Sequence, residues 1–264
     1  MALCVSKLNI VAYLRDNQHN HIVSDLSFSV ERGKKLAVVG RSGCGKTMTA
    51  MAILGLLPEN CVSDGSISLD GEELTSLPSK KRRAILGEKL VYIPQSGADF
   101  LNPSVKIAKQ MDEALTHAGV VKSERKDKMR ELLAITGLDE IDRLLSAYPF
   151  QLSGGMCQRI VMAMASVGNP GLVIADEPTR GVDRENAELF MKNLDEMFSG
   201  SAVLLITHDI SVAASCDDIL VMNAGKLVEW GTSYKITHEP ESDYTHMLIC
   251  DLPHALDHAR KEMM

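Results

Sequence analysis

The sequence predicts an α/β fold with a mostly parallel sheet, an antiparallel β edge and an inserted helical segment. Three observations predict it. Short β-rich runs alternate with helical patterns on both sides of a central stretch. That stretch, 96–158, carries its apolar residues at helical spacing. A glycine-rich loop stands directly between a buried β run and a helical pattern.

Each expected element follows from its local pattern. Alternating apolar and polar residues indicate the antiparallel edge strands, and unbroken apolar runs indicate buried strands. A helix is expected over 47–57, and Pro58 is expected to end it. Strands are expected at 3–12, 26–30, 35–39, 66–70, 90–93, 171–175 and 202–206, with a hairpin across 223–225.

Domain organisation follows from the change of pattern along the chain. A length of 264 residues lies within the upper range of one domain and permits a real core. We therefore expect one domain with a helical insertion. Its core comprises 1–95 and 159–233, the helical subdomain 96–158, and a C-terminal extension 234–264.

Composition excludes several classes of function. The 28 Lys and Arg against 35 Asp and Glu give a net charge of −7, which disfavours nucleic acid as a partner. No apolar stretch approaches the ~20 residues that span a bilayer, and the first residues lack a secretory pattern. The six cysteines include no C-x-x-C pair. A cytosolic chain with reduced thiols is expected.

The glycine-rich loop reads Gly-Arg-Ser-Gly-Cys-Gly-Lys-Thr and fits the pattern G-x-x-x-x-G-K-[ST] in its proper strand-to-helix context. Backbone N–H groups of such a loop converge on phosphate oxygens, helped by the positive end of the helix. We expect Lys46 to contact the β- and γ-phosphates, and Thr47 to offer its hydroxyl to Mg²⁺. The same potential leads us to expect thiolate character at Cys44. The nucleotide-binding candidates are Gly40, Arg41, Ser42, Gly43, Cys44, Gly45, Lys46 and Thr47.

Two carboxylates follow the apolar run at 172–175. Asp176 at the strand tip is expected to bind Mg²⁺, and Glu177 to orient or deprotonate an attacking water. Solvated acids often end a buried strand, so the pair alone leaves both interpretations open. The phosphate loop upstream favours the functional one.

Two more polar residues follow apolar strands. His208 comes after the run ending at Thr207, and the carboxyl ends of strands are where ligands of open α/β sheets collect. Gln95 follows 90–93 and has an amide oxygen suited to Mg²⁺ or the water. An ordinary surface His and a polar loop start are the alternatives.

The pentapeptide Leu-Ser-Gly-Gly-Met at 152–156 completes the pattern. Together with the phosphate loop, Asp176, Gln95 and His208, it resembles the ATP-binding subunit of an ABC transporter, over nearly the whole chain. The resemblance implies a P-loop NTPase cassette with a RecA-like core. It also implies that Ser153, Gly154 and Gly155 of one cassette contact the γ-phosphate held by another, with ATP and Mg²⁺ as cofactors.

The sequence is most similar to the oligopeptide, dipeptide and nickel importer branch. The segments 148–159, 100–103 and 225–232 carry this similarity, as does Tyr244-Thr245. Ser242-Asp243 stands where His-Pro is usual, and Cys157 replaces the usual Arg. Peptide-importing members of the branch often have a Cys-rich C-terminal tail, whereas this sequence has only Cys250 there. This difference slightly favours the shorter nickel-type subunits.

Resemblance also assigns Asp183 to the D-loop and Tyr13 to the adenine-stacking position. The D-loop ends in Gly-Val-Asp where this branch more often has Ala-Leu-Asp. An aromatic face suits adenine, although an ordinary edge-strand Tyr remains an alternative. His19 and His21 stand in a polar stretch and are expected to be solvated rather than metal ligands.

The expected function is ATP hydrolysis that drives import of a peptide or a nickel or other metal chelate. The resemblance implies a second ABC ATPase subunit, identical or a sister, and separate membrane permeases, with a solute-binding protein as an indirect partner. The chain would then lie peripherally on the cytoplasmic face of the membrane. A soluble ABC ATPase of DNA repair or translation is the alternative, and a nucleotide-binding regulator without turnover is a third hypothesis, disfavoured by Glu177 and His208.

Overall fold

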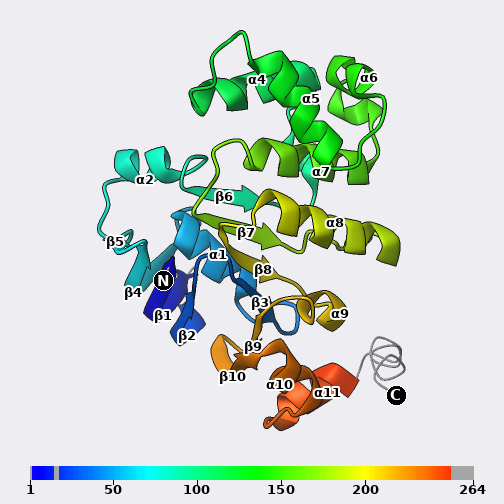
Figure 1. Cartoon of the computed structure of the whole chain (residues 1–264). Coiled ribbons are helices and arrows are strands. Elements are labelled where there is room, and N and C mark those ends of the chain that lie inside the picture. Colours follow the sequence, from blue (N-terminus) through cyan, green and yellow to red (C-terminus); the bar gives the residue numbers. More distant parts are fainter. Residues whose placement is uncertain (1, 15–17, 251–264) are drawn as a thin grey trace, which may run out of the picture. The chain divides into compact units, whose positions relative to one another are not determined.

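The computed structural model describes residues 2–14 and 18–250. The chain forms two compact units, one made of 1–82 with 202–264 and the other of 83–201 (Figure 1). Within the described ranges, no helix combines the length and apolar character needed to cross a membrane. The expected domain boundaries within 1–264 remain a prediction.

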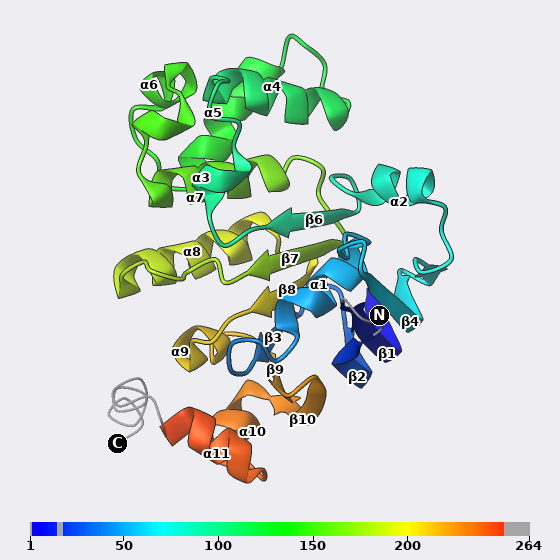
Figure 2. The same ribbon diagram turned by 180° about the vertical axis from the view of Figure 1, so that it is seen from behind.

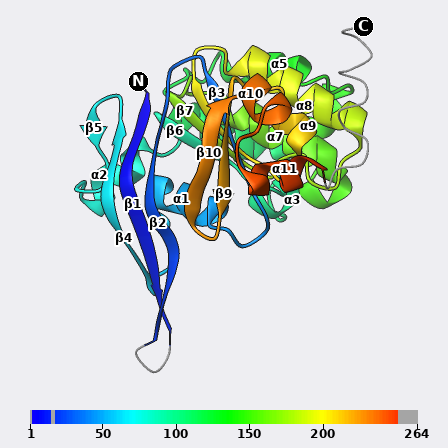
Figure 3. The ribbon, with the colours of Figure 1, turned by 90° about the horizontal axis from the view of Figure 1, so that it is seen from below.

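The first unit contains an antiparallel sheet in the order β2-β1-β4-β5. Its long strands lie side by side in Figure 3. The predicted strand at 26–30 is too short, because β1 supplies partners as far as Tyr13 opposite His19. The strand predicted at 66–70 likewise begins earlier. The bounds are β1 Leu3–Tyr13, β2 His19–Val30, β4 Cys61–Leu69 and β5 Glu72–Glu73.

The same unit contains neighbouring strands in the order β10-β9-β3-β8. Parallel pairing joins β3 to both β8 and β9, and a hairpin joins β9 to β10 as predicted. Positive φ at Ala224 and Gly225 makes this tight turn. The bounds are β3 Lys35–Val39, β8 Ala202–Ile206, β9 Asp218–Asn223 and β10 Lys226–Thr232.

In the described part of this unit, helices α1, α9, α10 and α11 accompany these strands. Helix α1 ends before the predicted 57, because Gly55 adopts a left-handed conformation with φ of 73° and caps the last turn. As far as Cys250, the C-terminal extension contains two helices, and both lie beside β10 in Figure 2. The bounds are α1 Lys46–Leu54, α9 Ile210–Ala213, α10 Ser233–His238 and α11 Asp243–Cys250.

The second unit combines a parallel strand pair, β6 Leu90–Ile93 and β7 Leu172–Asp176, with helices. Its apolar core includes buried Ile107, Met111 and Leu133, as the helical spacing predicted. Helix α2 Ser79–Ile85, which was not predicted from the sequence, begins in the first unit and ends in the second. The other helices are α3 Gly97–Phe100, α4 Ile107–His117, α5 Arg125–Ile135, α6 Ile141–Ser146, α7 Gly154–Ala165 and α8 Arg184–Met197.

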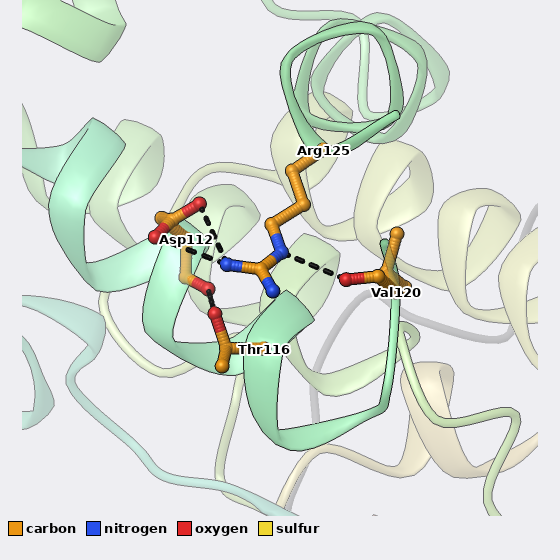
Figure 4. A network of polar contacts seen from close by, with 4 residues as sticks. All are labelled: Asp112, Thr116, Val120 and Arg125. Atoms are coloured by element: carbon orange, nitrogen blue, oxygen red, sulfur yellow. Dashed lines mark hydrogen bonds and ion pairs between the residues drawn. The ribbon is translucent and has the colours of Figure 1, made fainter. Parts of the chain in front are cut away.

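A polar network ties α4 to the start of α5 (Figure 4). The Arg125 guanidinium donates to the carbonyl of Val120 at 2.8 Å and lies 3.4 Å from Asp112 Oδ1. Thr116 donates to the carbonyl of Asp112 within α4. The turn between the two helices is thus held by side chains from both of them. Parallel strands, an antiparallel sheet and a helical segment confirm the predicted α/β class.

Candidate functional site

The loop between β3 and α1 requires its glycines. Gly40 and Gly45 have φ of 153° and 104°. A Cβ on Gly40 would lie 2.2 Å from the carbonyl oxygen of Met222, and one on Gly45 would lie 2.9 Å from Val23 Cγ2. Both the backbone angle and the space therefore exclude other side chains. This allows the loop to turn tightly into the first turn of α1.

Lys46 lies against the loop rather than in solvent. Its side chain is buried, and Nζ donates to the carbonyl of Gly40 at 2.7 Å and to that of Arg41 at 3.2 Å. Thr47 follows on the exposed side of α1. The ammonium group is thus held at the strand end of the loop, where an anion bound by the loop would meet a positive charge.

Cys44 corrects one expectation. Its side chain is only 5% exposed. Burial raises the pKa of the Cys44 thiol, and the charge of Lys46 lowers it by less. The predicted thiolate character is therefore wrong. The helix start does favour an anion, but desolvation of the sulfur outweighs that effect.

In the second unit, Asp176 and Glu177 stand at the end of β7. Asp176 is buried, and Glu177 is half-buried with a left-handed φ of 48°. Such strain at a non-glycine residue is typical of functional sites. The Tyr92 hydroxyl lies 3.4 Å from Asp176 Oδ2 and donates to it. Burial, followed by the charge of Asp176, raises the pKa of Tyr92, so the hydroxyl keeps its proton.

Tyr92 was not predicted from the sequence, although strand pairing gives a signal for it. Tyr92 pairs with Ile174, two residues before Asp176, in the parallel ladder of β6 and β7. Side chains two residues apart on a strand share a face of the sheet. Correct pairing of these two strands would therefore have placed the hydroxyl near the carboxylate.

The pentapeptide forms the start of α7. Ser153 caps the helix, because its Oγ accepts the N–H of Met156 at 3.3 Å. A Cβ built on Gly154 or Gly155 would have no atom within 4 Å apart from the neighbouring backbone of α7. The helix start thus presents an uncovered surface.

Gln95 lies within the same unit, next to a segment that contacts α7. Its side chain is exposed at the end of β6. The preceding residue, Pro94, accepts a 2.8 Å hydrogen bond from Nε2 of Gln158 on α7. The segment that carries Gln95 is therefore attached to the helix that begins with the pentapeptide.

Asp183 caps α8. It accepts the backbone N–H of Asn186 at 3.0 Å and the side-chain amide of Asn186 at 2.7 Å. These bonds hold the pKa of Asp183 below its usual value. A small hollow of the second unit lies beside this segment, lined by Gly155, Gln158, Arg159, Pro178, Val182, Asn186 and Phe190.

The remaining candidates belong to the first unit. His208 is exposed just after β8, and Tyr13 is 55% exposed at the end of β1. Their roles stay predictions. His19 and His21 are exposed with ring centroids 5.6 Å apart. No group of three or more potential metal ligands from His, Cys, Asp and Glu occurs in the described part of the chain.

Known proteins are similar to this chain over most of its length. The ABC transporter family matches residues 23–180. The dipeptide transport ATP-binding protein DppD of Haemophilus influenzae is 39% identical over 88% of this chain and 72% of its own length. The metal-staphylopine import system ATP-binding protein CntD of Staphylococcus aureus is 34% identical over 92% of this chain and 91% of its own.

Solved structures show the same fold. The ATP-binding cassette MJ0796, in a dimeric post-hydrolysis state bound to ADP and Pi, aligns with a TM-score of 0.76 at 23% identity, over 88% of this chain and 98% of its own. The cbiO1 protein of Clostridium perfringens, part of the transporter complex cbiONQ, gives 0.74 at 25% identity, over 91% and 92%. The fold class predicted from the sequence is confirmed.

Proposed function

Because the chain belongs to the ABC transporter family and is an ATPase, we propose that it is the energy-supplying subunit of an importer for peptides or metal chelates. One observation carries this proposal. Relatives that match 88–92% of the chain are named for dipeptide transport and for metal-staphylopine import. A match of that extent includes the phosphate loop, both carboxylates and the pentapeptide.

The proposed site residues have the chemistry that ATP hydrolysis requires. The loop 40–47 binds the phosphates, with Lys46 as their positive partner, and Tyr13 stacks on adenine. Glu177 orients or deprotonates the attacking water, and His208 contacts the γ-phosphate. The positive charge of Lys46 suits a triphosphate. The negative charge of Glu177 suits a water that must lose a proton.

Mg²⁺ fits the donors that this chain offers. Thr47 supplies a hydroxyl, Asp176 a carboxylate and Gln95 an amide oxygen, and all three are oxygen ligands of the kind that Mg²⁺ prefers. The ion would neutralise charge on the phosphates. The Tyr92 hydroxyl donates to the Asp176 carboxylate and helps to fix its orientation.

A second cassette completes the site. The uncovered start of α7, with Ser153, Gly154 and Gly155, presents backbone donors that suit the γ-phosphate bound by a partner cassette. Asp183 lies on the exposed segment before α8. The partner is a second copy or a sister ATPase. The pair lies peripherally on the cytoplasmic face of the membrane, bound to separate permeases, and a solute-binding protein delivers the cargo to them.

The proposal is tested with Glu177→Gln. Loss of the carboxylate removes the group that directs water, while the phosphate loop survives, so this variant should bind ATP and Mg²⁺ as a stable dimer without releasing phosphate. Size-exclusion chromatography with light scattering measures the dimer, alone and with a sister subunit. Lys46→Ala is the control and should lose ATP affinity. A Glu177→Gln protein that stays monomeric in both mixtures at saturating nucleotide would contradict the proposal.

A further inference from the structure

We infer that Tyr244, on α11 of the C-terminal extension, is a positioning residue for the phosphate loop, and that its hydroxyl sets the affinity for ATP. The inference rests on the proposed role of loop 40–47 as the nucleotide site. It gives the extension a part in that site.

The contact joins one residue of the loop to two residues of α11. The backbone N–H of Arg41 donates to the Tyr244 hydroxyl at 3.2 Å. The guanidinium of Arg41 lies 3.8 Å from the sulfur of Met247, one helical turn further along. The extension therefore contacts both the backbone and the side chain of Arg41.

The peptide group that Tyr244 contacts is the one that also holds Lys46. A planar trans peptide points its carbonyl and its N–H in opposite directions. In the peptide between Gly40 and Arg41, the carbonyl accepts Lys46 Nζ at 2.7 Å and the N–H donates to Tyr244. This peptide group is thus hydrogen-bonded at both its carbonyl and its N–H. Tyr244 therefore helps to fix the orientation of the carbonyl that accepts the Lys46 ammonium.

This restraint acts on a segment that is rich in glycine. Gly40 and Gly43 have no side chains and can adopt many backbone angles, so ordering them around an anion costs conformational entropy. A hydroxyl that holds the first peptide of the loop orders it in part before ATP binds, so less conformational entropy is lost on binding. Affinity for ATP should then depend on the hydroxyl.

The C-terminal extension is itself anchored, so it can act as a support. Glu229 of β10 is buried and accepts the backbone N–H groups of Glu241 at 2.9 Å and Ser242 at 3.1 Å. Burial would raise the pKa of Glu229, but the Glu241 N–H and further hydrogen bonds lower it below its usual value, so the carboxylate stays charged. Thr245 and Ile249 are buried on α11. Tyr244 therefore projects from a helix fixed to the sheet.

The test removes a single oxygen atom. Tyr244→Phe, made in the full chain, keeps the ring and loses only the acceptor for Arg41. We expect ATP to bind roughly three- to tenfold more weakly, the range for one hydrogen bond, with kcat changed much less than KM. Amide hydrogen exchange in peptides covering 40–47 should become faster. Tyr234→Phe, in α10 of the same extension, is the matched control and should leave ATP affinity and exchange unchanged.

The outcomes separate this inference from the proposed function. If the wild-type protein binds ATP and Lys46→Ala weakens that binding, but Tyr244→Phe equals the wild type in ATP affinity and in exchange, the inference is overturned. If neither the wild type nor Lys46→Ala binds ATP with saturation, the proposed function itself fails. If Tyr244→Phe lowers thermal stability, exchange at 40–47 decides: faster exchange there than in the rest of the first unit supports the inference, and a uniform rise overturns it.

Discussion

Gln158 Nε2 donates a 2.8 Å hydrogen bond to the carbonyl of Pro94, across 64 residues of sequence. Gly97 packs on the same stretch of α7, so closely that a Cβ would lie 2.6 Å from the backbone nitrogen of Gln158. One side-chain bond and one backbone contact thus hold the segment around Gln95 against the helix that begins with the pentapeptide. Movement of one requires movement of the other.

Gly97→Ala should break this contact. The added methyl group would meet backbone atoms that cannot move aside as a flexible side chain can, so we expect the free energy of unfolding to fall by about 1–3 kcal/mol. We also expect a lower kcat, because Gln95 would be displaced. Urea unfolding and steady-state ATPase assays measure the two effects.

Gly200→Ala is the control for Gly97→Ala. Gly200 lies in the same unit, and nothing lies within 4 Å of a Cβ built on it. We expect its unfolding free energy to stay within about 0.5 kcal/mol of the wild type. Equal stability of the two variants would show that α7 can yield to the added methyl group.

The sequence predicted best those elements whose chemistry is local. The strands at 35–39, 90–93 and 202–206 have the predicted bounds, because each is a short apolar run between polar or turn residues. The turn at Ala224 and Gly225 was also predicted correctly from its local sequence. The strand over His19–Val30 was underestimated, because its polar first half is held by pairing with β1 rather than by its own composition.

Side-chain contacts between distant segments could not be predicted. The bonds from Gln158 to Pro94 and from Arg41 to Tyr244 join residues 64 and 203 positions apart. Neither an amide nor a hydroxyl leaves a periodic pattern in a sequence. The prediction of thiolate character at Cys44 was wrong for a related reason. The burial of its sulfur depends on packing from several segments of the chain.

Cys44 should react slowly with alkylating reagents. Its thiol is buried and its pKa is raised, and only the thiolate is a good nucleophile. Iodoacetamide at pH 7.5 should therefore modify the exposed Cys250 well before Cys44. Peptide mapping by mass spectrometry follows both sites over time. Equal rates at the two cysteines would restore the thiolate prediction.

Glu73 should make stability depend on pH in the acid range. Burial raises its pKa, but hydrogen bonds from Ser66, Thr75 and the N–H of Ile67 lower it to about 2. An unfolded Glu titrates near about 4.3. The charged form therefore stabilises the fold fully above about 4.3, and this contribution is lost as the pH falls toward about 2.

Glu73→Gln tests this contribution. At pH 7 the variant should lose about 1–2 kcal/mol of unfolding free energy, a figure reduced for partial solvent screening. The difference from the wild type should shrink between pH 4 and pH 3 in urea unfolding. Glu59→Gln, at an exposed site, is the control and should show no such trend. A difference that stays constant with pH would mean that packing, not charge, makes Glu73 stabilising.

Tyr92→Phe should raise the Mg²⁺ concentration that half-saturates ATP hydrolysis. The hydroxyl donates to Asp176 Oδ2 and helps to fix the orientation of a carboxylate proposed to bind the ion. Loss of such a supporting hydrogen bond weakens metal binding by about 10- to 100-fold in known sites. The 3.4 Å distance places the expected effect at or below about 10-fold. Titration with Mg²⁺ at saturating ATP measures it, and binding of ATP without Mg²⁺ should stay unchanged because the loop at 40–47 is intact. If half-saturation by Mg²⁺ is unaltered while stability falls, Tyr92 serves only the packing of β6.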